Sequence, residues 1–285
     1  VNSGRIDNKG VELSLTLNQN LGPVDWTSGL IYSRNKNKIV DMLDAEFNGK
    51  QFQSDQLSVG GLTGVQMWLI KGHSVGDIYV RGLKTDEHGY VWVSPTASTV
   101  VPADVTGGIS SMIYAGNVNP SWTGSWRNDF KWNGINLGVL ITARVGGIGV
   151  SLTEATLDSF GMSQRSAEAR DNGGALVNGV RIPAEAYYKT IGGTGSSALG
   201  AYYTYSMTNV RLAEVSLGYD IPVQKWQNVL KGLNVSFVGK NLAMLYCKAP
   251  FDPEVASGTG NYSNGIDYFT MPSTRNLGFS VKVTF

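Results

Sequence analysis

Few residues of this chain could do chemistry, and their spacing favours no reaction. His73 and His88 are the only histidines, and they lack a cysteine or acidic partner at the spacing of a metal site. Cys247 is the only cysteine, so an intrachain disulfide and a cysteine-based cluster are excluded. Residues 192–197 are glycine-rich like a phosphate-binding loop, but no lysine and no helix pattern follow them. We therefore expect no catalytic residue, no metal site and no cofactor.

Two other groups of side chains could bind a ligand or a partner. Asp252 and Glu254 flank Pro253 and could hold a cation, although we favour a turn that the proline fixes. Aromatic side chains in the expected loops could stack on sugar rings or on a partner protein, or could pack their own loop. These candidates for substrate or partner contact are Trp92, Tyr114, Tyr262 and Tyr268.

The composition indicates wide aromatic surfaces and few charges. Charged residues make up 16% of the sequence, whereas glycine occurs 36 times, tyrosine 13 times and tryptophan 7 times, unlike the Lys/Glu-rich surface of an average soluble enzyme. The formal net charge of +1 gives no electrostatic footprint for nucleic acid, which we exclude as a partner. No segment approaches the roughly 18 consecutive apolar residues of a membrane-spanning helix, so a membrane interpretation must rest on strands.

The elements that position these residues are predicted by strict alternation of apolar and polar residues. In the last seven residues, Phe279, Val281, Val283 and Phe285 share one face, and Ser280, Lys282 and Thr284 share the other. This is the pattern of a barrel strand with lipid outside and water inside. Similar runs occur at 11–18, 24–32, 122–132, 135–145, 211–221 and 233–240. We predict an all-β fold with seven strands of a transmembrane antiparallel β-barrel.

The alternation also assigns side chains to the two faces of the barrel. Aromatic residues on the outward face are expected to form girdles at the lipid interface: Trp26, Tyr32, Trp122, Trp132 and Tyr219. Charged residues on the inward face could line a solute path or pair with neighbouring carboxylates: Arg127, Lys131, Arg144 and Lys282.

The connections between the runs alternate between short and long. Short connections lie at 20–24, 222–232 and the turn dipeptide Asn133-Gly134, and long ones at 40–119, 150–206 and 246–273. Short helices are expected at 183–190 and 226–230. In outer-membrane barrels the short turns are periplasmic and the long loops extracellular. The carboxyl terminus is then periplasmic, and an odd number of strands indicates a piece of a larger barrel.

Several motifs together resemble one family, the SusC/RagA-type TonB-dependent outer-membrane transporters, which are nutrient importers of Bacteroidetes. They lie at 8–13 (NKGVEL), 72–79 (GHSVGDIY), 116–120 (GNVNP), 209–222 (NVRLAEVSLGYDIP), 238–242 (VGKNL) and 251–254 (FDPE). The resemblance implies a plugged barrel of about 22 strands, of which residues 1–285 would be the carboxyl-terminal part, with the plug and the other strands upstream.

The same resemblance implies a function without catalysis. A glycan oligosaccharide or a peptide would be imported across the outer membrane, with energy supplied through TonB, which engages the upstream region. A SusD-like surface lipoprotein would close over the extracellular side as a lid. Two alternatives stay open from the residues alone: a passive porin or adhesin-type barrel, and a soluble glycan-binding β-sandwich.

Overall fold

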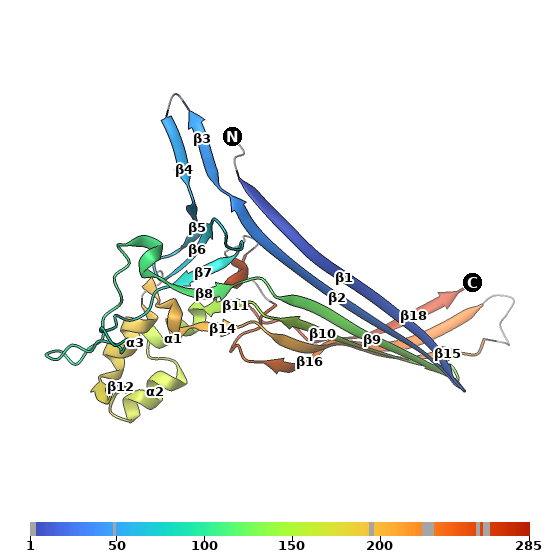
Figure 1. Cartoon of the computed structure of the whole chain (residues 1–285). Helices are drawn as coiled ribbons and strands as arrows, with labels where there is room; N and C mark the ends of the chain where they lie inside the picture. Colours follow the sequence, from blue (N-terminus) through green and yellow to red (C-terminus); the bar gives the residue numbers. More distant parts are fainter. Residues whose placement is uncertain (1–3, 48–49, 194–196, 224–230, 255–256, 259–262) are drawn as a thin grey trace.

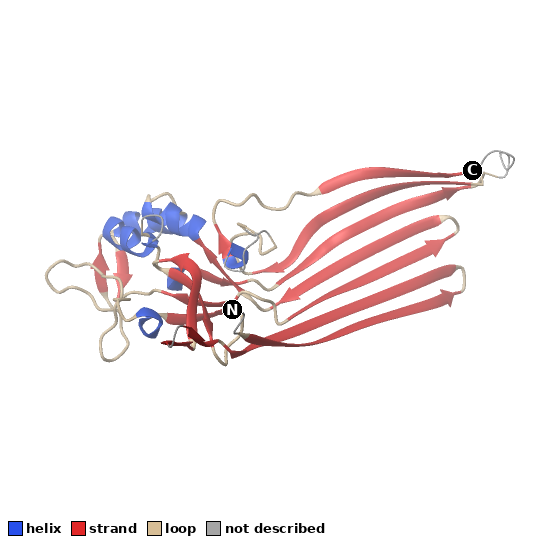
Figure 2. Ribbon diagram, turned by 90° about the horizontal axis from the view of Figure 1, so that it is seen from above, coloured by secondary structure: helices blue, strands red, loops and turns tan. Residues whose placement is uncertain are grey.

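The structure, a computed structural model, describes residues 4–47, 50–193, 197–223, 231–254, 257–258 and 263–285. It has two parts (Figure 1). One is a large antiparallel sheet of long strands, which we call the wall sheet. The other, which we call the loop assembly, contains the helices and short strands between 43 and 117, 148 and 206, and 249 and 271, gathered at one end of the wall sheet (Figure 2).

The wall sheet has seven strands in the order β1-β2-β9-β10-β15-β16-β18. Their bounds are β1 (Arg5–Leu21), β2 (Val24–Asp41), β9 (Trp122–Trp132), β10 (Ile135–Val145), β15 (Asn209–Ile221), β16 (Gly232–Cys247) and β18 (Asn276–Thr284). Each predicted run corresponds to one of these strands, and 122–132 and 135–145 match β9 and β10 at both ends. The predicted all-β fold class is therefore confirmed.

Tight turns join the strands at the end of the sheet away from the loop assembly. Between β9 and β10, Asn133 and Gly134 have φ angles of 45° and 84°, the pair of left-handed conformations that a two-residue hairpin needs. Gly22, with φ of 67°, turns the chain between β1 and β2. The predicted helix at 226–230 lies outside the described residues. The amino terminus is at the loop-assembly end and the carboxyl terminus at the short-turn end (Figure 2), as the strand count predicted.

One face of the wall sheet is largely apolar. Directly opposed residues of antiparallel strands share a face, so the register defines rows across the sheet. The clearest row is Trp26, Phe130, Leu137, Leu217, Phe237 and Phe279. Trp26 stacks on Phe130, with ring centroids 6.2 Å apart, yet Phe279 is 82% exposed. An apolar face without a second layer is what lipid contact requires and what a soluble sandwich would cover.

Aromatic rows bound this apolar face at both ends. Trp132, Ile135 and Tyr219 are opposed near the short turns, and Tyr32 contacts Trp122 near the loop assembly, with ring centroids 5.6 Å apart. Trp122 and Trp132 delimit the 11-residue strand β9, a span of about 33 Å along the strand. At the usual barrel tilt of about 40°, this corresponds to about 25 Å of height, the apolar band of an outer-membrane barrel.

The loop assembly is ordered where the sequence predicted long loops. One sheet has the order β5-β6-β7-β8, another β14-β11-β17, and β3-β4 and β12-β13 are hairpins. The bounds are β3 (Leu43–Phe47), β4 (Lys50–Ser54), β5 (Gln56–Leu62), β6 (Val65–Ile70), β7 (Asp77–Val80), η1 (Gly108–Ser111), β8 (Ile113–Asn117), β11 (Ile148–Ser151), α1 (Leu152–Ser159), α2 (Gln164–Asp171), β12 (Ala175–Val177), β13 (Val180–Ile182), α3 (Ala184–Gly192), η3 (Gly200–Tyr202), β14 (Thr204–Ser206), η5 (Ser263–Gly265) and β17 (Ile266–Asp267). The helix predicted at 183–190 is confirmed as α3.

A hydrophobic core of described residues from several segments holds the loop assembly together. Fully buried side chains from separate segments meet in it, including Val65, Ile78, Val150, Ile182, Leu199 and Tyr203. Burial of such side chains stabilises by about 1.5–3 kcal/mol each, enough to order segments that are short and far apart in sequence. Among the described residues, no helix has the length and apolar character to cross a bilayer.

Candidate functional site

Two polar clusters join the loop assembly to the wall sheet, and both are built from the sequence motifs noted above. In the first, Asn117 of β8 donates from Nδ2 to Asp77 Oδ1 at 2.7 Å and to the Val75 carbonyl at 3.0 Å. Val75 N–H in turn donates to Asn37 Oδ1 on β2 at 2.6 Å. The motifs at 72–79 and 116–120 therefore meet, and together they dock on the upper end of β2.

The second cluster surrounds Arg211, a side chain of β15 that is 5% exposed. Its guanidinium pairs with Asp252, lies 3.3 Å from Glu254 Oε1, and donates to Asn241 Oδ1 at 3.0 Å. Asp252 also accepts from the Glu254 backbone N–H at 3.1 Å, which is the turn expected around Pro253. Burial alone would raise the pKa of Asp252, but the Arg211 hydrogen bond holds that pKa below its ordinary value. The carboxylate pair therefore binds an internal guanidinium.

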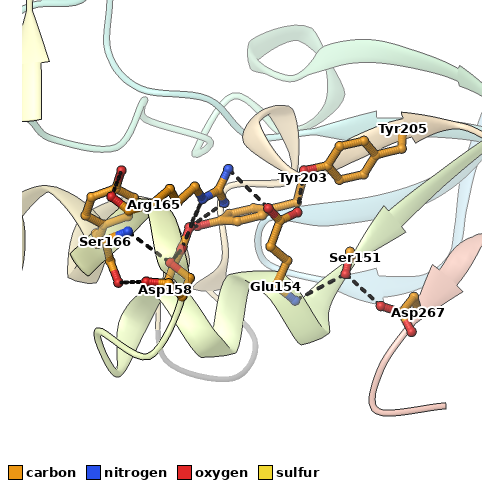
Figure 3. Close-up of polar contacts among 10 residues, drawn as sticks. Ser151, Glu154, Asp158, Arg165, Ser166, Tyr203, Tyr205 and Asp267 are labelled. Atoms are coloured by element: carbon orange, nitrogen blue, oxygen red, sulfur yellow. Dashed lines mark hydrogen bonds and ion pairs between the residues drawn. The ribbon is translucent and has the colours of Figure 1, made fainter. Parts of the chain in front are cut away.

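A third polar network lies inside the loop assembly (Figure 3). Asp158 of α1 is fully buried and accepts from Arg165 Nε at 2.9 Å, Ser163 Oγ at 2.5 Å and Tyr203 Oη at 2.8 Å. The Arg165 guanidinium also covers the Tyr203 ring, 5.0 Å from its centroid. Because a buried charge without partners is very unfavourable, this convergence fixes α1, the start of α2 and the Tyr203 segment together.

Glu154 and Ser151 extend the same network to β14 and β17. Tyr205 Oη donates to Glu154, Arg165 Nη1 lies 3.3 Å from Glu154 Oε1, and Ser151 Oγ donates to Asp267 Oδ2 at 2.6 Å. Burial, with the nearby carboxylates, raises the pKa of Tyr203 and of Tyr205, so both phenols stay protonated donors at neutral pH. The network is fully paired and has no free nucleophile or base, which suits a structural role.

A surface pocket opens beside this network. Its volume is about 610 Å³, and its lining includes Asp158, Ser166, Arg170, Glu185, Tyr188 and Lys189. Phe160, at the end of α1, also lines it and is 73% exposed, as is the nearby Met162. An exposed aromatic and an exposed methionine beside a polar pocket are chemically suited to contact a peptide, a sugar or a partner protein.

The structure places the predicted contact aromatics on separate parts of the loop assembly. Trp92 is half-buried, with the Lys84 ammonium 4.9 Å above its ring. Tyr114 on β8 contacts Tyr79 and donates to Asp77 Oδ1 at 3.3 Å, and burial raises the pKa of Tyr114 to about 12. Tyr268 is exposed beside Phe269. Tyr262 lies outside the described residues.

The predicted inward charges lie on the polar face of the wall sheet, where two of them pair with carboxylates. Arg127 Nε lies 2.8 Å from Asp129 Oδ2, and Lys131 Nζ lies 3.1 Å from Asp220 Oδ2. Two further cations complete the set. Arg144 donates from Nη2 to the Val118 carbonyl at 3.2 Å, and Lys282 is opposed to Asn234. The pair within β9 and the pair between β9 and β15 match the alternative in which inward charges find neighbouring carboxylates.

His73 has an acidic neighbour that the spacing of residues in the sequence did not predict. His73 Nδ1 lies 3.3 Å from Asp77 Oδ2, four residues further on, and the same carboxylate accepts from Asn117 and Tyr114. The contact belongs to the cluster that docks β8 on β2. No group of three potential metal ligands occurs within the described ranges.

Most residues of the Asp158 network were also missed, although one local signal was present. Ser151-Leu-Thr-Glu154 has the pattern of a helix-capping box, and Ser151 Oγ accepts from the Glu154 N–H at 3.1 Å. That signal could have located the start of α1. The partners Arg165 and Tyr203 come from other segments, and only the tertiary fold brings them to Asp158.

Comparisons with known proteins agree with this architecture. No family model matches the chain. Two curated proteins of Formosa agariphila are similar over the whole chain: TonB-dependent receptor P3, 23% identical over 304 residues, and TonB-dependent receptor P26, 24% identical over 303 residues. The chain spans 29% and 30% of the length of these receptors.

Solved structures of RagAB show the same fold. One, described as the RagAB peptide transporter, matches with a TM-score of 0.65 and 17% identity, covering 100% of this chain and 30% of that one. Another, the RagAB peptide importer in an open-open state, also gives a TM-score of 0.65 and covers 99% of this chain and 29% of its own. The resemblance to SusC/RagA-type TonB-dependent outer-membrane transporters, first indicated by the motifs, is thereby confirmed along the whole of this chain.

Proposed function

We propose that this chain forms part of the wall and the extracellular rim of an outer-membrane barrel that imports a glycan oligosaccharide or a peptide. TonB supplies the energy, and the chain itself catalyses no reaction. The observation that carries the proposal is the loop assembly, which has its own buried core and stands at one end of a lipid-facing sheet. Ordering long rim segments is entropically unfavourable, and it suits a surface that must bind a partner or a solute in one geometry.

The loop assembly is, in this proposal, the docking surface for a SusD-like surface lipoprotein that acts as a lid. Phe160 and Met162 beside the pocket are the first contacts we assign to the partner or substrate, together with Tyr114, Tyr268 and Trp92. Tyr262 belongs to the same proposed set from its position in the sequence. The inward cations Arg127, Lys131, Arg144 and Lys282 are assigned to the wall of the solute path.

Residues 1–285 are proposed to be the carboxyl-terminal part of the barrel domain. The chain matches only 30% of the length of TonB-dependent receptor P26. In this proposal, the remaining strands of a barrel of about 22, the plug and the TonB-engaging segment lie upstream. The short turns and the carboxyl terminus would face the periplasm. This orientation places the loop assembly at the cell surface.

A growth experiment in the native bacterium tests the import proposal. Deletion of the gene should abolish growth on one limiting pool, either oligosaccharides or peptides, and removal of TonB should give the same defect. Collapse of the proton-motive force should stop uptake of that pool within minutes. Uptake that persists without TonB would favour a passive porin and contradict the proposal.

A matched pair of variants tests the assigned contact surface. Phe160→Ser with Met162→Ser should reduce both uptake and co-purification of the lipoprotein. Leu176→Ser, at another exposed apolar position, on the β12-β13 hairpin, should reduce neither. Equal defects in the Phe160/Met162 variant and the Leu176 variant would contradict the assignment of the surface around α1 as the contact surface.

A further inference from the structure

The β1-β2 hairpin carries exposed cations above the apolar face of the wall sheet. These are Lys9 on β1 and Arg34, Lys36 and Lys38 on β2, all exposed, and we call them the cationic patch. Lys9 is directly opposed to Lys36, and Arg34 to Val11. Among the described residues, none of the four makes an ion pair. Asp7, which is opposed to Lys38, pairs with Arg5 at 2.9 Å.

The cationic patch points to the lipid side of the sheet. Leu13 and Tyr32 are opposed on the apolar face, and side chains two positions along a strand keep that face. Arg34, Lys36 and Lys38 therefore continue the face of Tyr32. The opposite face is occupied, because Asn37 accepts from Ser74 Oγ at 2.6 Å and Ile39 is 2% exposed under the loop assembly.

The cationic patch begins in the headgroup layer and extends above it. Tyr32 belongs to the upper aromatic row, which marks the edge of the hydrocarbon. Arg34, Lys36 and Lys38 lie two, four and six positions further along β2, or about 5, 10 and 15 Å higher at the usual barrel tilt. The interfacial layer of a bilayer extends about 5–8 Å beyond the hydrocarbon on each side, so Arg34 lies within it and the two lysines lie above it, from where their long side chains reach back toward it.

A hollow lies below the cationic patch on the same lipid-facing surface. Its volume is about 380 Å³, and its lining is Leu15, Thr16, Leu17, Ser28, Leu30 and Trp126. Ser28, small and opposed to Leu17, leaves the space between the leucines, and Trp126 Nε1 donates to Ser28 Oγ at 3.0 Å. With that donor paired, the hollow presents apolar walls suited to an acyl chain.

We propose that the outward surface of the β1-β2 hairpin binds an acylated, phosphorylated glycolipid of the outer leaflet, with its phosphates on the cationic patch and an acyl chain in the hollow. The inference rests on the proposed orientation, in which the loop assembly faces the cell exterior. Charge complementarity selects an anionic over a zwitterionic lipid, and the hollow selects a lipid over free phosphate. The hairpin would thereby be anchored at a fixed height in the outer leaflet.

Native mass spectrometry of the intact, detergent-purified protein tests this binding. The probes are bisphosphorylated lipid A, phosphatidylethanolamine and inorganic phosphate. Removal of three cations, by Arg34→Gln, Lys36→Gln and Lys38→Gln, should weaken lipid A binding by about a hundredfold, since each cation near an anionic surface contributes about fivefold. The matched control, Lys50→Gln, Lys231→Gln and Lys248→Gln, removes the same charge from exposed positions elsewhere and should change binding less than twofold.

A second variant tests the hollow. Ser28→Leu should weaken lipid A binding and leave any binding of inorganic phosphate unchanged. Three outcomes would overturn the proposal: undiminished lipid A binding by the triple variant, equal affinity for phosphatidylethanolamine, or displacement of lipid A by millimolar phosphate. The assay needs neither TonB nor substrate, so its failure leaves the import proposal standing, and failed import leaves lipid binding measurable.

Discussion

The wall sheet and the loop assembly are stabilised in opposite ways. In the loop assembly, buried side chains such as Val150, Leu199 and Tyr203 form a core like that of a soluble domain. In the wall sheet, large apolar side chains such as Phe279 and Leu217 stay exposed, and backbone ladders join the seven strands. The first part hides its apolar surface from water within itself, whereas the second leaves that surface to lipid.

This difference indicates where charge is tolerated in each part. At the height of the apolar band, the wall sheet has ion pairs such as Arg127 with Asp129 on its polar face, where water is available. The loop assembly buries several carboxylates, of which Asp158 is the most deeply buried, and surrounds Asp158 with donors. An added charge should therefore destabilise the protein most at the lipid face of the sheet. Removal of a charge should destabilise it most at the centre of the loop assembly.

The largest effect is expected from Asp158→Asn. This nearly isosteric change removes the charge that Arg165 and Tyr203 face and should destabilise the loop assembly by about 3–5 kcal/mol. Amide hydrogen exchange should then accelerate in α1, α2 and α3 while the wall strands stay protected. Glu168→Gln, on the exposed part of α2, is the control and should leave exchange unchanged.

Val139→Arg tests the effect of an added charge on the lipid face of the wall sheet. Val139 is opposed to Asn128 and Val215, between the two aromatic rows, so its side chain lies near the middle of the apolar band. An arginine there should cost about 2–4 kcal/mol of barrel stability, read from urea unfolding in lipid vesicles. Lys282→Arg, on the polar face, should change the midpoint little. Equal effects would contradict the lipid-facing assignment.

Tyr203→Phe should have a smaller effect on the loop assembly. It removes one hydrogen bond to a charged acceptor, which contributes about 1.5–3 kcal/mol, while Arg165 and Ser163 still satisfy Asp158. Thermal unfolding followed in the α1 to α3 region should show a loss that is clearly less than that of Asp158→Asn. A loss of stability as large as that of Asp158→Asn would mean that Tyr203 stabilises the loop assembly through packing of its ring.

The raised pKa of Tyr203 also predicts that the loop assembly, and not the wall sheet, loses stability at alkaline pH. Burial raises the pKa of Tyr203 above its unfolded value, so the folded state retains a proton that the unfolded state loses above about pH 10. Stability from this group is complete below about pH 10 and declines as pH rises beyond it. In Tyr203→Phe this decline should be shallower, and an unchanged alkaline profile would contradict the assignment.

The smallest effect is expected from Ile135→Arg. Ile135 lies on the same strand as Val139 and is directly opposed to Trp132 and Tyr219, so its side chain lies at the aromatic girdle near the short turns. Arginine near the interface should cost about 0–1 kcal/mol, against the larger loss at Val139. A loss at Ile135 that equals or exceeds the loss at Val139 would place the apolar band lower on the sheet.

The sequence predicted the wall sheet closely because its signal is local. In β9, the alternation of Trp122, Trp126 and Trp132 with Arg127 and Lys131 extends over the whole strand, and hairpin pairing then follows from chain order. The girdle aromatics and the face of each inward charge follow from the same period, since a barrel wall repeats one pattern from strand to strand.

The loop assembly could not be predicted in the same way because its contacts are distant in sequence. β11 pairs in parallel with β17, and Ser151 bonds Asp267 across 116 positions. Strands such as β12 and β17 have three and two residues, too short to show a period. The clusters around Asp158 and Arg211 exist only once these short segments have docked, although the motifs that form the Arg211 cluster were visible in the sequence.

Cysteine labelling on intact cells tests the central claim most directly, namely that the loop assembly faces the cell exterior and the short turns face the periplasm. In a Cys247→Ala background, Leu176→Cys and Lys231→Cys each place one exposed thiol at opposite ends of the molecule. A membrane-impermeant maleimide should label Leu176→Cys on intact cells and Lys231→Cys only after the outer membrane is permeabilised. The reverse order, or labelling of both on intact cells, would contradict the account.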